Sequence, residues 1–327
     1  MVVLCHIDQC IVKRISIKTG RRSVMSFAKD EIAAEYRAAQ AAMKEAYSTR
    51  AVSGKKVEIP WQEHEPVQTI FYYPTDFSAD RLPVYINLHG GGFVEGDMVT
   101  MDSFCRKLAD EAGILVVNVN YHLAPDYVFP YPLQETQTVC DYLRSNSSQL
   151  QVNVQRIGLG GFSAGATIAL GLSIQSIQSD RQMYHYCVCG YPAVSFFPAD
   201  CKGEDGGSAI DEKMSIGIQI YENGNEMNPV CTPLLADDET LGKMPKTCMF
   251  VAGVDELNRQ GRRFAARLAA NGVTICFHEY KDAYHGFFEV NREDYFLPDS
   301  RKNDLQKKLT EEAEQFVIQT IKGFVFA

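Results

Sequence analysis

Apolar residues in this chain form seven short runs, most without the regular polar alternation of a half-exposed strand. Unbroken apolar runs separated by segments of helical periodicity are typical of a parallel sheet covered by helices on both faces. The expected strands lie at 67–74, 82–92, 113–121, 156–161, 184–192, 246–253 and 273–280. The expected helices lie at 26–48, 102–113, 132–146, 163–178, 258–272 and 302–324. The pattern therefore predicts an α/β fold.

Two parts of the chain interrupt this alternation of strands and helices. Residues 1–24 show no helical period and form an expected arm, followed by an Ala-rich helix with Ser26 as its expected N-cap. Residues 196–245 separate two expected strands but are far more numerous than a crossover requires. This second segment is interpreted as an insertion of short helices and loops.

Composition and charge exclude several classes of partner. The formal net charge is −9 and no long Lys/Arg run occurs, which argues against a nucleic-acid or anionic-membrane surface. No stretch reaches the roughly 18 apolar residues of a membrane span. The N-terminal segment has no basic n-region and its apolar run is interrupted by His6 and Asp8, so no signal peptide is expected.

The ten cysteines are interpreted as reduced structural thiols of a cytoplasmic protein. No CxxC pair occurs, and Cys187 and Cys189 alternate within an apolar run as small buried residues do in a strand. The absence of CxxC and HExxH motifs disfavours a thioredoxin-like or zinc-dependent enzyme. We expect neither a metal nor an organic cofactor.

A serine lies between two glycines where an apolar strand is expected to meet a helix. The pentapeptide 161–165, GFSAG, fits the G-x-S-x-G pattern, in which a sharp turn exposes the hydroxyl above the sheet. Bulky Cβ groups would obstruct such a turn, which explains Gly161 and Gly165. The amide of Ala164 would lie at a helix N-terminus beside the hydroxyl. Ser163 is therefore the candidate nucleophile.

A serine nucleophile needs a base that is oriented by a carboxylate. Of the seven histidines, His285 lies just past the last expected strand, at the sheet edge where catalytic groups of α/β folds collect. By the same rule, Asp255 follows the strand that ends at Gly253. Asp282 and Glu256 are the competing carboxylates, but Asp282 shares the loop of the histidine and Glu256 is expected to face away.

The segment HGGGFVEGD (89–97) supplies backbone donors. Three consecutive glycines after a strand allow two N–H groups to face a ligand, and with the Ala164 amide they would form a three-donor oxyanion hole. His89 is interpreted as structural support that hydrogen-bonds the loop. No second histidine or acidic ligand is spaced near it to bind zinc.

Five motifs in sequence order resemble the hormone-sensitive-lipase-like family of α/β-hydrolase esterases. They are HGGGF (89–93), YHLAPDYVFPYPLQE (121–135), GFSAG (161–165), GVDEL (253–257) and YHGF (284–287). The resemblance implies an α/β-hydrolase fold with a mostly parallel eight-stranded sheet, helices on both faces and a helical cap. It implies an N-terminal arm and cap helices at 1–50, a first core part at 51–194, a cap insertion at 195–238 and a second core part at 239–327.

Site roles follow from the resemblance position by position. Ser163 would be the nucleophile, His285 the base and Asp255 its orienting acid. Gly91, Gly92 and Ala164 would donate to the oxyanion. The chain departs from the family pattern at four positions, of which Phe162 would narrow the pocket. The departures are Phe162 before the serine, Ala166 after the motif, and His122 and Asp126 in place of the usual Arg and Glu.

The sequence thus predicts a serine carboxylesterase acting on small, short-chain acyl esters through an acyl-enzyme intermediate. The candidate substrate pocket is aromatic and comprises Phe93, Phe162, Phe196, Phe197, Phe287 and Phe288. An amidase or deacetylase with the same triad, or a catalytically silent small-molecule receptor, are the alternatives. The expected partner is a small-molecule ester, and neither a nucleic acid nor a membrane is expected. A homodimer is left open as the oligomeric state.

Overall fold

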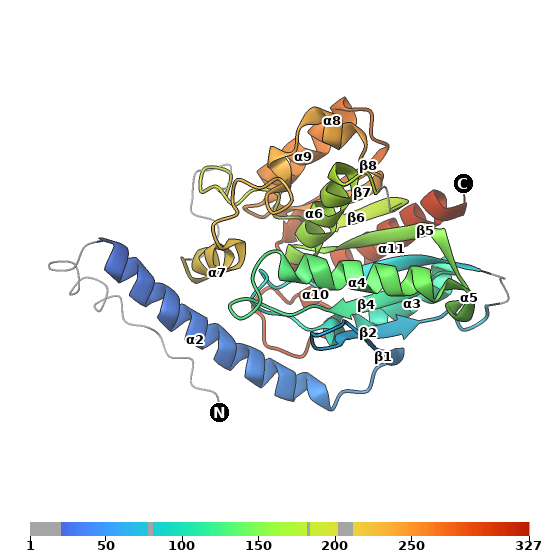
Figure 1. Ribbon diagram of the computed structural model, residues 1–327, viewed down its shortest axis with the longest axis horizontal. Coiled ribbons are helices and arrows are strands. Elements are labelled where there is room, and N and C mark those ends of the chain that lie inside the picture. The colour runs from blue at the N-terminus through green and yellow to red at the C-terminus, as the bar shows by residue number, and fades with distance from the viewer. Residues whose placement is uncertain (1–20, 78–80, 182–183, 202–211, 327) are drawn as a thin grey trace.

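Eight strands form a single twisted sheet at the centre of the molecule (Figure 1). The computed structural model describes residues 21–77, 81–181, 184–201 and 212–326, with side chains from residue 29 onward. The strands are β1 (Lys55–Ile59), β2 (Val67–Tyr72), β3 (Leu82–Leu88), β4 (Leu115–Asn120), β5 (Val152–Phe162), β6 (Tyr186–Gly190), β7 (Lys246–Val254) and β8 (Ile275–Tyr284). Their order is β1-β2-β4-β3-β5-β6-β7-β8. The β1–β2 and β2–β4 pairs are antiparallel and all other pairs are parallel, which confirms the expected mostly parallel eight-stranded sheet.

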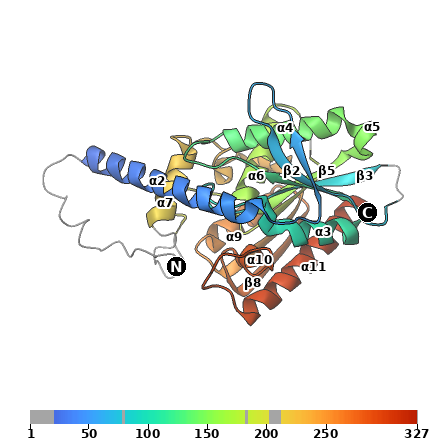
Figure 2. The same ribbon diagram turned by 90° about the horizontal axis from the view of Figure 1, so that it is seen from below.

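Helices cover both faces of this sheet (Figures 1 and 2). The helices are α2 (Arg21–Ser48), α3 (Asp102–Ala112), α4 (Tyr131–Ser145), α5 (Ser147–Leu150), α6 (Ala164–Gln178), α7 (Glu212–Glu222), α8 (Asp238–Gly242), α9 (Asn258–Ala270), α10 (Phe287–Val290) and α11 (Asp304–Phe326), with short 3₁₀ turns η1 (Met98–Met101) and η2 (Pro233–Leu235). Helices α4, α6 and α9 pack on one face, and α3, α10 and α11 on the other. Within the described ranges no helix is both long enough and apolar enough to cross a bilayer.

The two faces of the sheet bury two separate hydrophobic clusters. Leu159 of β5 belongs to the cluster under α4, α6 and α9, whereas Phe162 of the same strand belongs to the cluster under α3 and α11. All seven residues of β3 are buried, as expected for a central strand that is covered on both sides. The continuous apolar runs of the central strands therefore correspond to strands with no solvent-facing side, whereas β8 at the end of the sheet is partly exposed.

Helices α2 and α7 lie side by side, outside the layers of the sheet and its covering helices (Figures 1 and 2). The Tyr36 hydroxyl donates to the carbonyl of Lys213 at 3.1 Å, and the Lys213 ammonium lies 3.1 Å from the Glu35 carboxylate. We call this pair of helices the cap. The division of the chain into core and cap ranges remains a prediction.

The structure departs from the sequence-based expectation in two elements. Strand β1 was not expected, because its residues KKVEI are mostly exposed and include three charged side chains. The first described helix begins at Arg21, so Ser26 lies within the helix and the expectation of an N-cap there is wrong. The remainder of the expected arm, residues 1–20, lies outside the described residues.

Candidate active site

Ser163 occupies the turn between β5 and α6. Its backbone has φ 50° and ψ −117°, an unfavourable conformation for a residue with a Cβ, and α6 starts at the next residue. A Cβ atom at Gly161 or at Gly165 would lie 2.2 Å from the carbonyl oxygen of Leu88, at the end of β3. The two glycines therefore allow strand, turn and helix to approach closely. This packing raises the serine at the carboxyl edge of the sheet.

His285 and Asp255 complete a hydrogen-bonded line with this serine. Ser163 Oγ lies 2.9 Å from His285 Nε2, and His285 Nδ1 lies 2.8 Å from Asp255 Oδ2. A carboxylate can only accept, so Nδ1 carries the proton and Nε2 is free to accept from the serine hydroxyl. Asp255 follows β7 and His285 follows β8, the two neighbouring strands at one end of the sheet. The structure thus brings together the three predicted side chains from distant parts of the sequence.

The surroundings of the histidine favour its protonated form. Burial alone would lower the pKa of His285, but the charge of Asp255 and its hydrogen bond outweigh this effect and raise the pKa above its usual value. Arg301 opposes the increase, whereas Glu289 adds to it. The site is arranged to stabilise an imidazolium that forms when the histidine takes a proton.

The carboxylate on His285 Nδ1 is that of Asp255 rather than that of either competing residue. Asp282 is exposed, and Glu256 lies on the cavity wall. His89 is buried, its Nδ1 lies 2.7 Å from the carbonyl oxygen of Gly90, and its ring stacks on Tyr121 with centroids 4.3 Å apart. Burial lowers the pKa of His89 to about 4, so this side chain is neutral. Its contacts fit the expected structural support of the loop.

The glycine loop after β3 borders the serine. Gly91 and Gly92 have φ values of 113° and 60°, and both line the same cavity as Ser163 and Ala164. The N–H groups of Val94 and Glu95 donate to the carbonyl oxygen of Gly91 at 3.2 and 2.8 Å, which fixes the loop as a tight turn. The amide of Ala164 is the first of α6, where helical N–H groups have no intrahelical acceptor.

A cavity of about 310 Å³ opens above the serine between the sheet edge and the cap. Its wall includes Met43 and Tyr47 from α2 and Met214 and Ile218 from α7. The other wall residues come from the glycine loop, from loops at the carboxyl ends of the strands, and from η1, α6 and α10. The cap therefore contributes mostly apolar side chains to a site whose charged groups come from the core.

The predicted aromatic pocket is only partly correct. Phe93 lines the cavity, and its ring stacks on Tyr221 with centroids 3.8 Å apart. Phe162 is fully buried on the α3 and α11 side of the sheet, where its ring stacks on Phe288 with centroids 4.3 Å apart. The expectation that Phe162 narrows the pocket is therefore wrong, because its side chain points away from the serine.

The other four aromatic residues of the predicted pocket are not among the described wall residues of the cavity. Phe287 and Phe288 are fully buried in the same cluster as Phe162. Phe196 packs edge-on against Phe93 with centroids 5.8 Å apart, behind the wall, and is half-buried. Phe197 is half-buried in the segment after β6 and is not among the described wall residues.

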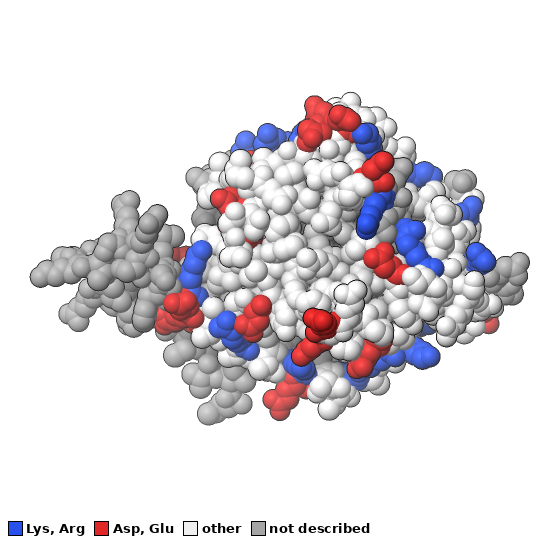
Figure 3. Space-filling view, in the orientation of Figure 1, with Lys and Arg blue, Asp and Glu red and all other residues white. Residues whose placement is uncertain are grey.

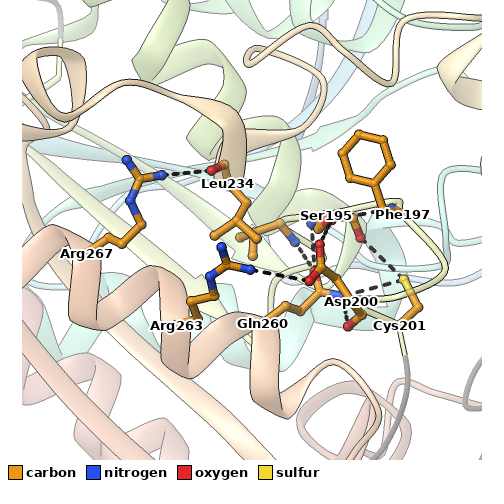
Figure 4. Close-up of polar contacts among 9 residues, drawn as sticks. Ser195, Phe197, Asp200, Cys201, Leu234, Gln260, Arg263 and Arg267 are labelled. Atoms are coloured by element: carbon orange, nitrogen blue, oxygen red, sulfur yellow. Dashed lines mark hydrogen bonds and ion pairs between the residues drawn. The ribbon is translucent and has the colours of Figure 1, made fainter.

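Sequence reasoning missed Gln260, which fixes the segment that follows β6 (Figure 4). Gln260 on α9 is buried, and its Oε1 accepts the N–H groups of Val194 and Ser195, each at 2.7 Å. Its Nε2 donates to the carbonyl oxygen of Asp200 at 3.3 Å. The start of the insertion is thereby joined to the helix that follows Asp255. A lone glutamine inside an amphipathic helix gives no sequence signal of this role.

Arg301 is a second residue that sequence reasoning missed. Its Nη1 donates to the carbonyl oxygen of His285 at 2.8 Å, and its Nε donates to Asp299 at 2.8 Å. The guanidinium thus fixes the backbone of the turn that carries His285.

Among the described residues, no group of three or more His, Cys, Asp and Glu side chains is placed to hold a metal ion.

A serine on a strand–helix turn, an imidazole and a carboxylate at one edge of a mostly parallel sheet define the class of α/β-hydrolases. Residues 85–289 match the model of a family described as having the alpha/beta hydrolase fold. The match spans more than half of the chain. The chain belongs to the hormone-sensitive-lipase-like family of α/β-hydrolase esterases.

Individual relatives agree with this membership. The esterase LipI of Mycobacterium tuberculosis is 29% identical over 228 residues, which cover 68% of this chain and 71% of that protein. An acetyl esterase of Salmonella paratyphi B is 39% identical over 108 residues, which cover 33% of this chain and 32% of the relative. The solved carboxyl esterase 2 of the fungus Tuber melanosporum shares the fold with a TM-score of 0.71 at 23% identity, covering 88% of this chain and 98% of that one.

Proposed function

We propose that the chain is a serine carboxylesterase that hydrolyses small, uncharged esters with a short acyl chain. Ser163 is the nucleophile, His285 the general base and Asp255 the acid that orients the histidine. The observation that carries this proposal is the hydrogen-bonded line from Ser163 Oγ through the imidazole to Asp255, with distances of 2.9 and 2.8 Å. The raised pKa of His285 supports the role of proton acceptor.

In the acylation step, His285 Nε2 takes the hydroxyl proton while Ser163 Oγ attacks the ester carbonyl carbon. The carbonyl oxygen becomes an oxyanion, which the backbone N–H groups of Gly91, Gly92 and Ala164 bind. The imidazolium then gives its proton to the alkoxide, the C–O bond breaks and the alcohol leaves. An acyl ester of Ser163 remains.

In the deacylation step, water takes the place of the alcohol. His285 removes a proton from this water as its oxygen attacks the acyl carbon, and the same three amides bind the second oxyanion. The proton returns to Ser163 Oγ, the acyl–serine bond breaks and the carboxylic acid leaves. The cycle needs no redox step, and it consumes one water for each ester hydrolysed.

The preference for small esters is supported by the cavity and by the relatives. A volume of about 310 Å³ is at the lower end of the range typical of small-molecule pockets. Met43, Met214 and Ile218 give the wall on the cap side an apolar surface. Two curated relatives are an acetyl esterase of Salmonella and an arylesterase of Saccharolobus solfataricus.

Replacement of the nucleophile tests the proposal. Ser163→Ala should lower kcat for p-nitrophenyl butyrate by roughly 10⁴-fold or more with an unchanged far-ultraviolet circular dichroism spectrum. Ser173→Ala is the matched control, because Ser173 lies buried on α6, the helix that follows Ser163, and its hydroxyl donates to the carbonyl of Ala169 at 2.8 Å. Parent-like hydrolysis by the Ser163 variant would show that another group attacks the ester.

Comparison of p-nitrophenyl esters with p-nitroanilides of the same acyl group distinguishes the esterase from the amidase and receptor alternatives. A p-nitroanilide that is cleaved faster than the matched p-nitrophenyl ester would indicate an amidase or deacetylase. Binding of an ester without turnover would indicate a silent receptor. The proposal expects kcat/KM to be much higher for the ester.

Two further expectations are part of the proposal. A cytoplasmic location is supported by the eight described cysteines, which are all free thiols, and is tested by cell fractionation.

A homodimer is supported by the position of β8 at the end of the sheet, where Phe277 is 39% exposed. Light scattering should then give twice the chain mass of 36.6 kDa, whereas a monomer mass would contradict the dimer.

A further inference from the structure

A buried carboxylate lies between the glycine loop and the histidine turn. Glu289 on α10 is 8% exposed and lines the cavity. Its Oε1 accepts the N–H of Gly90 at 2.7 Å, and the Tyr191 hydroxyl donates to its Oε2 at 3.2 Å. A Cβ atom at Gly90 would lie only 2.7 Å from Oε2, so carboxylate and loop are in close contact.

Packing alone does not explain a carboxylate at this position. Burial of an ionisable group is costly, and an apolar residue of similar size would stabilise a core better. Burial raises the pKa of the Glu289 carboxyl, and the hydrogen bonds from Gly90 and Tyr191 and the charges of His285 and Arg301 oppose this increase. Its two hydrogen bonds go instead to the glycine loop and to Tyr191, which follows β6.

The position of Glu289 joins two parts of the site that are far apart in sequence. The bond to Gly90 spans 199 residues and ends one residue before Gly91. At its other end, α10 begins two residues after His285, and Gly286 is its N-cap. A single side chain thus links the loop that carries the oxyanion donors to the turn that carries the base.

We propose that Glu289 is a positioning residue that holds the glycine loop in register with Ser163 and His285. The catalytic part of this inference depends on the proposed esterase function, because it assigns the loop to oxyanion binding. Misplacement of such donors by about 1 Å is expected to cost on the order of 10²-fold in rate, with little effect on ground-state binding. Glu289 would therefore act on kcat rather than on KM.

The charge of Glu289 has a second, separable effect on His285. The groups that shift the pKa of this imidazole are Asp255, Arg301 and Glu289, and Tyr191 contacts its edge with ring centroids 5.1 Å apart. Burial lowers the pKa of His285, while Asp255 and, more weakly, Glu289 raise it. Removal of the Glu289 charge should therefore move the acidic limb of the pH–rate profile to lower pH.

Two variants separate the hydrogen bond from the charge. Glu289→Leu keeps the volume but removes the acceptor, and kcat for p-nitrophenyl butyrate should fall roughly 10- to 100-fold with KM within about 3-fold. Glu289→Gln keeps an oxygen for the Gly90 N–H, so kcat should stay within about 5-fold while the acidic limb moves to lower pH. Parent-like kcat in the Leu variant overturns the proposal. A Gln variant as impaired as the Leu variant also overturns it.

Hydrogen exchange of the loop tests the proposal without relying on activity. Peptides covering residues 89–97 should exchange faster in Glu289→Leu than in the parent, because the Gly90 N–H loses its acceptor. Thr310→Ala is the matched control: the Thr310 hydroxyl donates to the carbonyl of Phe287 at 2.8 Å, so this variant loses a buried bond to α10 that does not reach the loop.

If the loop exchanges at the same rate in Glu289→Leu as in Thr310→Ala, the positioning role is contradicted, even if the parent hydrolyses no ester. An inactive parent would by itself contradict only the esterase function. If the Leu variant does not fold, the test depends on Glu289→Gln alone. In that variant the proposal requires loop exchange like that of the parent and kcat within about 5-fold.

Discussion

Asp255 holds the imidazole of His285 through one carboxylate oxygen while the other oxygen is fixed to the backbone. Oδ2 lies 2.8 Å from His285 Nδ1, and Oδ1 accepts the N–H of Leu257 at 2.9 Å. The side chain of Asp255 is 1% exposed, so its orientation is set by these bonds rather than by solvent. The carboxylate therefore determines both the tautomer of the histidine and its affinity for a proton.

The pH dependence of the reaction should reflect this pair. Burial lowers the pKa of His285 but Asp255 raises it further, and the net pKa lies above the usual value of 6.5. Because only the neutral imidazole can accept the serine proton, kcat/KM should fall as the pH drops through this raised pKa. The midpoint of the acidic limb is therefore expected above pH 6.5. A rate that is flat from about pH 5 to 8 would argue against a histidine base.

Removal of the Asp255 charge should change both rate and profile. Asp255→Asn leaves a side chain of the same shape but favours the wrong tautomer, and kcat should fall by about 10⁴-fold. Any residual activity should show an acidic limb at lower pH than the parent, since the group that raises the pKa is gone. The expected result is obtained from kcat/KM measured across the pH range. An unchanged rate would assign the orienting role to another carboxylate.

Acyl-chain preference should depend on Met214 of the cap. Its Sδ atom lies 2.2 Å from the position that a Cβ on Gly92 would take, so the thioether covers the glycine loop at the cavity wall. Met214→Ala should raise kcat/KM for octanoyl relative to butanoyl p-nitrophenyl esters by roughly tenfold. Met227, which is 68% exposed, provides the control Met227→Ala, for which the ratio should not change. An unchanged ratio in Met214→Ala would place the acyl group elsewhere.

Gln260 should contribute strongly to stability. Gln260→Leu leaves the buried N–H groups of Val194 and Ser195 without an acceptor, which should lower the free energy of unfolding by about 2 to 4 kcal/mol. Arg263 is one turn away, with a side chain 61% exposed and 3.4 Å from Asp200, and Arg263→Ala should cost no more than about 0.5 kcal/mol (Figure 4). Urea unfolding of both variants measures the difference, and equal losses would contradict the assignment.

His122 should make stability depend on pH in the opposite direction to a paired carboxylate. Its Nδ1 lies 2.6 Å from the buried Glu135, whose hydrogen bond is the main cause of the raised pKa of His122. The stabilisation is complete below the unfolded pKa of about 6.5 and is lost as the pH rises through the higher folded pKa. His122→Asn should thus destabilise the protein more at pH 6 than at pH 9. Equal destabilisation at both values would show that the ion pair contributes nothing.

The parallel sheet and the site could be predicted because their signals are local. Strands covered on both faces are apolar throughout, and Ser163 and Asp255 each follow such a strand. His285 follows β8, whose apolar run was recognisable although the strand lies partly exposed at the end of the sheet. The direction of the Phe162 side chain was not predictable from its neighbours, since it depends on which face of β5 the residue before the turn occupies. Strand β1 gives almost no apolar signal because it lies at an edge of the sheet.

Contacts between distant segments account for most of what the sequence did not reveal. Gln260 and Glu289 are polar residues on helices, and their importance appears only when the N–H groups of Val194 and Gly90 are found without other acceptors. The distribution of surface charge was likewise not predictable from the sequence. Acidic and basic side chains are interspersed on the face seen in Figure 3, so the net charge of −9 does not by itself locate a charged patch there.

Reaction with a fluorophosphonate probe tests the central claim most directly, because it depends on an activated serine and not on the choice of ester. The account predicts that Ser163 Oγ displaces fluoride and forms a phosphonyl ester. Peptide mass spectrometry should locate the adduct on Ser163, and His285→Gln should slow its formation at least about 10²-fold. An intact, folded protein that is not labelled, or is labelled at another residue, would contradict the account.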